Sequence, residues 1–271
     1  MYLWSKKWLL SFHPDKCKYM RVGRTNIEDQ GYKLEESLKK TTSEKDVGVI
    51  FDDKLKFGEH LAEKVNKANN IVGLIRRSFV NLDTEVFKPL FVTLVRPHIE
   101  YANQVWCPHL VKDIVTVENV QRRATKMVPQ LKDLTYEERL RKLKLPTLAY
   151  RRERGDMIEV FKIISGRYDE ECSEGVLQQR QDYTSRGHSR KLYKKRSRLD
   201  LRKYSFPYRI VDKWNSLPEW VVSASTVQQF EKRLDKFWAN QELVYNYRAQ
   251  IVVQYTPPPN SCYDVDLESQ A

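Results

Sequence analysis

The chain has 271 residues and a formal net charge of +12 at pH 7, with a mean hydropathy of -0.66. Its length allows one large domain or two to three small ones, and a hydrophobic content of 41% allows a real core. The N-terminus is too short and too polar for a signal peptide, and no apolar run approaches the length of a membrane span. We therefore expect an intracellular protein, nuclear or cytoplasmic or both, without a membrane partner.

The positive charge favours a polyanionic partner, because each Lys or Arg placed on a phosphate releases condensed counterions. A basic, soluble housekeeping domain is the alternative reading of the same charge. The cysteines form no CxxC pair, so neither a zinc ribbon nor a redox motif is supported, and reduced thiols are the simplest interpretation. No histidine pair has ligand spacing on a helix, so we expect no metal site.

The spacing of apolar residues predicts a mainly α-helical protein with a small α/β part at its N-terminus. Residues 18–22 alternate polar and apolar, as a half-buried strand does, and residues 46–51 form a β-prone run. After His60 the period changes to three or four, which predicts an amphipathic helix with Leu61, Val65, Ala68, Val72, Ile75 and Phe79 on its apolar face.

Several further helices are expected downstream. Asp83 caps one that ends at Pro97, and Thr135 with Glu138 resembles a capping box that opens another. The remaining helices are expected at residues 99–108, 111–127 and 147–164 and after Ser225, while Trp214 and the Asn215–Pro218 turn read as structural.

Residues 186–203 form the most basic stretch, with a single acid, Asp200. Tyr193 lies within it and further aromatics follow, a composition that suits a nucleic-acid strand with exposed bases. A solvated surface with aromatic core anchors is the alternative, and a nuclear localisation role fits the same residues. The candidate binding residues here are Arg186, Arg190, Lys191, Lys194, Lys195, Arg196 and Arg198.

Two smaller basic clusters lie on the predicted helices. Arg76 and Arg77 end the first long helix, and Arg122, Arg123 and Lys126 lie one turn apart on a later one. Each cluster is either a phosphate-binding surface or a solvated helix face.

A series of short motifs runs through the chain in order. They are W-S…W-L-L-S-F-H-P-D-K-C at residues 4–17, D-V-G-V-I-F-D at 46–52, L-V-R-P-H-I-E-Y…V-W…P at 94–108, V-Q-R-R-A-T-K at 120–126, R-R…R-G-D at 151–156, S-R-G-H at 185–188 and W-N-S-L-P…V-V at 214–222. Together they resemble the downstream half of jockey-like non-LTR retrotransposon reverse transcriptases. The resemblance covers roughly residues 4–240.

The resemblance implies an arrangement of parts. Residues 1–57 would be a remnant of the polymerase palm, with a primer-grip-like turn at Val47, Gly48 and Val49. Residues 58–130 would be the helical thumb and residues 131–256 a basic, helical C-terminal region. The proline-rich, polar residues 257–271 look like a disordered tail. The implied partners are RNA and DNA, as primer–template or single strand, and not a small-molecule substrate.

Catalysis is not expected of this chain on its own. The intact family polymerase holds magnesium ions with an aromatic-x-Asp-Asp turn that precedes the first motif. Phe51-Asp52-Asp53 lacks the intervening residue and follows the primer-grip-like segment, so we interpret it as a turn after a strand. The resulting expectation is a polymerase fragment that binds nucleic acid, with no catalytic residues and no cofactor. The alternative is a host-adopted helical scaffold without nucleic-acid binding.

Overall fold

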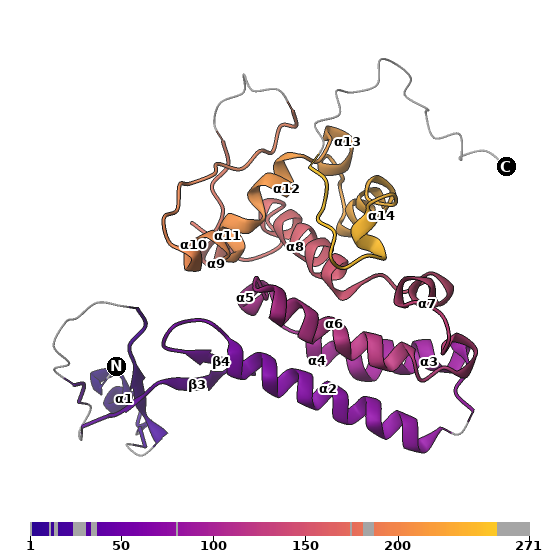
Figure 1. Cartoon of the computed structure of the whole chain (residues 1–271). Coiled ribbons are helices and arrows are strands. Elements are labelled where there is room, and N and C mark those ends of the chain that lie inside the picture. Colours follow the sequence, from indigo (N-terminus) through magenta and orange to yellow (C-terminus); the bar gives the residue numbers. More distant parts are fainter. Residues whose placement is uncertain are drawn as a thin grey trace. The chain divides into compact units, whose positions relative to one another are not determined.

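The computed structural model describes residues 2–10, 12–13, 16–23, 31–33, 37–79, 81–173, 175–180 and 187–253 (Figure 1). Over these residues the chain is mainly helical with two small sheets, which confirms the expected fold class. It forms two compact units, Met1–Lys132 and Asp133–Ala271. Residues 1–57 and 58–130, separated in the sequence analysis, therefore share one unit, and residues 257–271 lie outside the described part.

Unit 1 begins with short strands and continues with helices. Strands β1 and β2 pair in parallel, with Lys18 opposite Lys39, and β3 and β4 form an antiparallel hairpin. No helix in the described ranges is long and apolar enough to cross a membrane. The elements are α1 (Tyr2–Lys7), β1 (Lys18–Met20), β2 (Lys39–Thr41), β3 (Ser43–Asp46), β4 (Val49–Asp52), α2 (Gly58–Ser78), α3 (Thr84–Leu90), η2 (Phe91–Val95), α4 (Arg96–Glu100), α5 (Asn103–Trp106), α6 (Val111–Thr125) and η3 (Pro129–Leu131).

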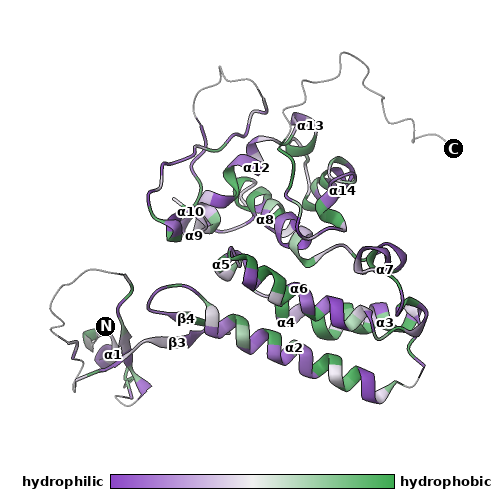
Figure 2. Cartoon of the chain, in the orientation of Figure 1, coloured by the Kyte–Doolittle hydropathy of each residue, from purple (hydrophilic) through white to green (hydrophobic). Residues whose placement is uncertain are grey.

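Helix α2 is the central helix of unit 1 and contacts both α4 and α6. Its expected apolar face is confirmed from Leu61 to Ile75, whereas Phe79 follows the helix and is exposed. Helix α6 buries Val117, Val120 and Ala124. Figure 2 shows hydrophobic stripes along these helices, as amphipathic packing requires.

The helix expected to end at Pro97 does not end there. Helix α3, the π-turn η2 and α4 run on without a break to Glu100, and the Arg96 N–H bonds to the Phe91 carbonyl five residues back. A proline ring clashes with the carbonyl four residues earlier in a regular α-helix, and a π-turn just before the ring relieves this conflict. The helix expected at residues 99–108 is consequently reduced to α5.

Unit 2 is built from short helices around one long helix, α8. The expected capping box of α7 is present, formed by Thr135 and Glu138. Thr147 caps α8, which was not expected from the sequence, and its hydroxyl donates to the Leu243 carbonyl at 2.6 Å. The elements are α7 (Tyr136–Leu143), α8 (Leu148–Ile164), α9 (Glu170–Ser173), α10 (Asp200–Lys203), α11 (Phe206–Arg209), α12 (Val211–Asn215), α13 (Glu219–Val222), α14 (Val227–Phe237) and η4 (Glu242–Val244).

Aromatic side chains form the centre of the unit 2 core. Phe161 of α8 stacks on Phe230 of α14 with ring centroids 4.4 Å apart, and Trp214 of α12 lies 5.8 Å from Phe230. All three are fully buried. Rings of this size contribute most of the apolar area that a small core can bury, so α8, α12 and α14 are held mainly through these contacts.

Ion pairs from Arg154 and Asp156 join α8 to its neighbours. The Arg154 guanidinium donates two hydrogen bonds to Asp235 of α14, at 2.6 and 2.9 Å. The Asp156 carboxylate, 1% exposed, accepts two from Arg209 of α11, at 2.8 and 2.9 Å. Burial raises the pKa of the Asp156 carboxyl, and the Arg209 guanidinium opposes that rise. The R-G-D motif at residues 154–156 therefore has a structural role in this fold.

Asp156→Asn should destabilise unit 2 by about 3 kcal/mol, because it leaves the largely buried Arg209 guanidinium without its carboxylate. Asp212→Asn is the matched control, since it breaks the exposed Lys194–Asp212 pair and should cost less than about 1 kcal/mol. Hydrogen exchange of peptides from α8 and α11 measures the difference. Equal loss of protection in the two variants would contradict the assigned role of Asp156.

Candidate nucleic-acid interface

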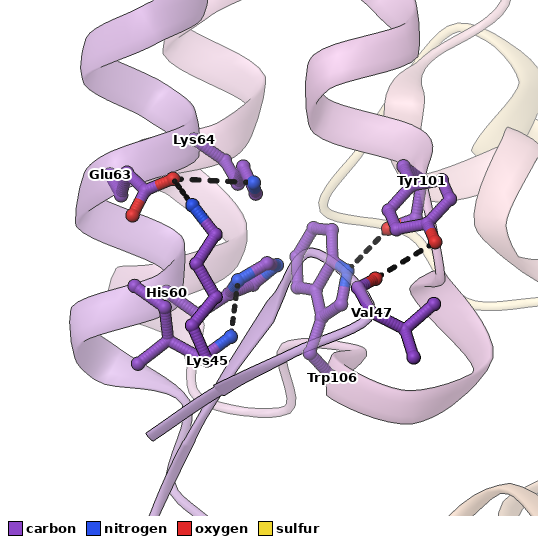
Figure 3. Close-up of polar contacts among 8 residues, drawn as sticks. Lys45, Val47, His60, Glu63, Lys64, Tyr101 and Trp106 are labelled. Atoms are coloured by element: carbon purple, nitrogen blue, oxygen red, sulfur yellow. Dashed lines mark hydrogen bonds and ion pairs between the residues drawn. The ribbon is translucent and has the colours of Figure 1, made fainter. Parts of the chain in front are cut away.

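The primer-grip-like residues form the tip of the β3–β4 hairpin (Figure 3). Val47 and Gly48 have positive φ angles of 43° and 79°, the backbone of a two-residue hairpin turn. Such a φ is strained for a β-branched residue. Val47 is 78% exposed, whereas Val49 is buried in the core, so only Val47 and Gly48 of this predicted site reach the surface.

His60 of α2 holds the hairpin from one side. Its Nδ1 accepts a hydrogen bond from the Ile50 N–H at 3.2 Å, so this nitrogen carries no proton, and the ring packs 5.3 Å from the Trp106 ring. The side chain is fully buried. Burial is the main cause that lowers the pKa of His60 to about 4, and the nearby Lys64 ammonium lowers it further. The neutral imidazole is therefore a structural acceptor at ordinary pH.

Tyr101 holds the tip of the hairpin from the other side. Its hydroxyl donates to the Val47 carbonyl at 2.9 Å, while its own carbonyl accepts from the Trp106 indole at 2.6 Å. A Cβ at Gly48 would lie 3.4 Å from the Tyr101 ring, so the ring covers the turn closely. Both bonds are visible in Figure 3. Together with His60, they fix the turn on the helices of unit 1.

Asp52 is the last residue of β4, and Asp53 begins the turn that follows the hairpin. The Asp52 carboxylate accepts hydrogen bonds from the backbone N–H groups of Lys54, Lys56 and Phe57, at 3.0, 3.1 and 2.6 Å. Such side-chain to backbone bonds are typical of Asp in turns. They confirm a turn after a strand, although Phe51 and Asp52 still belong to β4 and the turn that leads into α2 begins at Asp53.

The two basic clusters of unit 1 lie at the same end of its helices. Arg76 and Arg77 are exposed in the last turn of α2, and Arg122, Arg123 and Lys126 are exposed at the end of α6. Figure 1 shows α2 and α6 running in the same direction, with α3 and α4 returning between the end of one and the start of the other. The fold thus brings together two clusters that lie far apart in the sequence.

The third cluster begins with an anchored segment, residues 188–192. The Asn215 side chain accepts from the Leu192 N–H at 2.8 Å and donates to the Leu192 carbonyl at 2.9 Å. The Trp214 indole donates to the Arg190 carbonyl at 2.8 Å. His188, whose Nε2 lies 3.0 Å from the Trp214 carbonyl, accepts from the Arg190 N–H through Nδ1. We call these contacts of His188, Trp214 and Asn215 the backbone clamp.

The clamp joins the last two motifs of the series. S-R-G-H ends at His188, and W-N-S-L-P begins with Trp214 and Asn215, so the two segments meet through hydrogen bonds. Glu219 of α13 adds to this contact by accepting from the Ser189 N–H and hydroxyl at 2.7 and 3.0 Å. Gly187 precedes the clamp with φ +118°, a conformation that L side chains rarely adopt.

Residues 193–199, which we call the basic loop, leave the clamp and are exposed except for Ser197. In the described structure, residues 194–198 donate and accept no backbone hydrogen bond. Lys194 forms an ion pair with Asp212, whereas Lys195, Arg196 and Arg198 contact no carboxylate among the described residues. Three cations of the loop between the clamp and α10 thus have no carboxylate partner in the described part of the chain.

The other predicted binding residues of this stretch lie outside the basic loop. Arg190 and Lys191 belong to the clamped segment and are half-buried, and the Arg190 Nη1 atom is enclosed by protein. Arg186 lies outside the described residues. The clamp therefore divides the predicted cluster into a supporting part and an accessible part, Lys194, Lys195, Arg196 and Arg198.

Aromatic rings accompany the free cations. Tyr193 opens the basic loop and is half-exposed, and Tyr204, after α10, lies under the Lys203 ammonium at 5.3 Å. Exposed rings can stack on bases, whereas a duplex keeps its bases paired and inaccessible to such rings. By contrast, Phe206 and Tyr208 are half-buried, with Phe206 packed against the unit 2 core, so they act mainly as anchors.

Sequence reasoning missed the residues that build the site's support. Asn215 was assigned to a local turn, although its partner is Leu192, 23 positions away. His188 was assigned to the basic stretch and to the S-R-G-H motif without a structural role, yet burial lowers the pKa of its imidazole, and its unprotonated Nδ1 accepts from the Arg190 N–H. The signal available in the sequence was that S-R-G-H and W-N-S-L-P both belong to the same ordered series of motifs.

Comparison with protein-family models, with curated proteins and with solved structures finds no match to this chain.

The His60 contact predicts an acid-sensitive unit 1. Because the folded state lowers the pKa of His60 to about 4 from 6.5, the unfolded state takes up the proton first, and stability falls as the pH drops from about 6.5 to about 4. The total loss from this group is on the order of 3 kcal/mol. Urea unfolding at pH 7 and pH 4.5, followed by hydrogen exchange of α2 peptides, measures it.

His60→Asn retains an acceptor for the Ile50 N–H without a titrating ring, so it is the matched control. Its stability should depend less on pH over this interval, although other groups such as Glu63 and His98 still titrate. The same pH dependence in wild type and variant would rule out His60 as the source.

Asn215→Ala removes both side-chain bonds to Leu192 and leaves its backbone N–H and carbonyl without partners. We expect peptides over residues 188–193 to lose hydrogen-exchange protection by about 10-fold or more, because two buried bonds of about 1 kcal/mol each are lost. Asn246→Ala is the control, since Asn246 bonds locally to Glu242 and Arg248. Unchanged protection in Asn215→Ala would show that the clamp does not hold this segment.

Proposed function

We propose that this chain binds single-stranded RNA or DNA, with the basic loop as its principal contact, and that it is a fragment of a retrotransposon-derived RNA-directed DNA polymerase. The observation that carries the proposal is the set of three free cations, Lys195, Arg196 and Arg198, in a loop held at one end by the clamp. Adjacent, exposed cations suit a polyanion whose charges repeat along its backbone.

The aromatic rings favour a single strand over a duplex. Tyr193 is exposed beside the free cations, and unpaired bases can stack on such a ring. The clusters at the ends of α2 and α6 would supply further phosphate contacts in unit 1. Within this proposal, the hairpin tip at Val47 and Gly48 belongs to the palm remnant. The helices of unit 1 that follow the hairpin belong to the thumb.

The proposed activity is binding and not catalysis. The proposal includes no step that uses magnesium. Primer extension with template, primer and magnesium checks this part. Nucleotide incorporation by the purified chain alone would overturn it.

The binding site is tested by neutralising the basic loop. Lys195→Gln, Arg196→Gln and Arg198→Gln together should reduce the slope of log K against log salt by about 2 for single-stranded RNA, since each phosphate contact contributes about 0.7. The affinity should fall on the order of 100-fold at low salt. Fluorescence anisotropy with a labelled oligonucleotide, titrated from low to moderate salt, measures both quantities.

A matched control removes the same charge elsewhere in unit 2. Lys142→Gln, Lys232→Gln and Lys236→Gln neutralise three exposed lysines of α7 and α14. This variant should change the slope by less than half as much. Equal effects of the two triple variants would indicate unspecific charge attraction, and no affinity of the wild type at low salt would favour the scaffold alternative.

A further inference from the structure

We infer that Ser197 is a phosphorylation site for a serine kinase that selects basic residues before its acceptor, and that the phosphate weakens polynucleotide binding by the basic loop. The second half of this inference rests on the proposed function. Ser197 is preceded by Lys194, Lys195 and Arg196 and followed by Arg198, so cations surround the hydroxyl on both sides.

Two other hydroxyl residues lie close behind an arginine pair, and the structure favours Ser197 over both. Thr125 follows Arg122 and Arg123, and Ser78 follows Arg76 and Arg77. A kinase must draw the acceptor hydroxyl into its own catalytic site, next to the base that takes the proton. Exposure and backbone conformation therefore decide which of the three can react in the folded chain.

Thr125 follows basic residues as a kinase acceptor does, but its hydroxyl is not accessible to a kinase. It is 0% exposed in the last turn of α6, and its hydroxyl donates to the Arg122 carbonyl at 3.2 Å. Ser78 is exposed but is the last residue of α2, so its neighbours Arg76 and Arg77 are fixed in a helical backbone. Either residue could enter a kinase cleft only after local unfolding.

Ser197 is half-buried, but its backbone meets the requirement of a kinase cleft. Residues 194–198 form no backbone hydrogen bond with the described residues, so the segment can bind in a cleft without breaking secondary structure. The Ser197 hydroxyl donates only to the nearby Leu199 carbonyl, at 3.0 Å. The clamp and α10 lie on either side, so the loop can be modified while the unit 2 core stays folded.

The reaction is an ordinary phosphoryl transfer from ATP supplied by the kinase. The Ser197 Oγ forms a bond to the γ-phosphorus while the bond from that phosphorus to the β,γ-bridging oxygen breaks. ADP leaves with the electron pair, and the hydroxyl proton passes to the kinase's carboxylate base. The products are phosphoserine, ADP and a proton.

A phosphate at this place changes the charge that binds nucleic acid. Phosphoserine carries a charge of about -1.5 to -2 at pH 7. The three free cations lie within two residues of Ser197, so the phosphate reduces their combined charge of +3 to about +1. Loss of about two phosphate contacts predicts an affinity on the order of 10-fold lower at 0.1 M salt.

The acceptor is tested with the folded full chain, MgATP and the catalytic subunit of cyclic-AMP-dependent protein kinase. Mass spectrometry locates the phosphate, and peptides covering residues 119–129 and 191–201 provide the unfolded reference. We expect both peptides to react, but Ser197 to react at least 10-fold faster than Thr125 in the folded chain. Faster reaction at Thr125 in the folded chain, or none at Ser197, would overturn the inference.

The effect on binding is measured on the same samples by anisotropy with single-stranded RNA. Phosphorylated wild type should bind about 10-fold more weakly than mock-treated protein, whereas Ser197→Ala treated with kinase should not change. A mock-treated chain that binds and keeps its affinity after phosphorylation would overturn the inference alone. A mock-treated chain that binds no RNA would instead overturn the proposed function, while the mass spectrum still decides the modification site.

Discussion

The candidate interface depends on the two hydrogen bonds between the Asn215 side chain and the backbone of Leu192. An amide side chain offers one acceptor and two donors, so it can satisfy both backbone groups of one residue as a neighbouring strand would. Trp214, beside it in α12, has its ring in the unit 2 core and its indole N–H on the Arg190 carbonyl. The clamp thereby transmits the rigidity of the core to a segment that has almost no secondary structure of its own.

Unit 1 uses the same means to hold its hairpin. The Ile50 N–H bonds to the buried His60 ring and the Val47 carbonyl to the Tyr101 hydroxyl, so side chains of distant helical segments occupy backbone groups that a wider sheet would pair. A two-stranded hairpin is marginally stable by itself in water. In both units an exposed segment is held by a few side chains outside it, which in unit 1 lie 10 residues away for His60 and 54 for Tyr101.

Contacts between residues far apart in the sequence limited what could be predicted from the sequence alone. The face of α2, the Asp83 cap and the Thr135–Glu138 capping box follow from local spacing, and all three are confirmed. The predicted end of the helix at Pro97 was wrong, because a π-turn lets the helix continue through the proline and has no signature in residue types. Asn215 with Leu192 and Asp156 with Arg209 were missed for another reason. Such pairs depend on the tertiary fold, and local periodicity carries no information about them.

Ion pairs within unit 2 reduce the part of the positive charge that is available to a partner. Arg154, Arg209 and Lys213 direct their charges to Asp235, Asp156 and Glu153 within unit 2, so they belong to the fold and are not available to a polyanion. Lys195, Arg196 and Arg198, by contrast, contact no carboxylate among the described residues, and they are adjacent and exposed. Because binding to a polyanion depends on the number of free neighbouring cations, this local arrangement is a better guide to affinity than the surplus of +12.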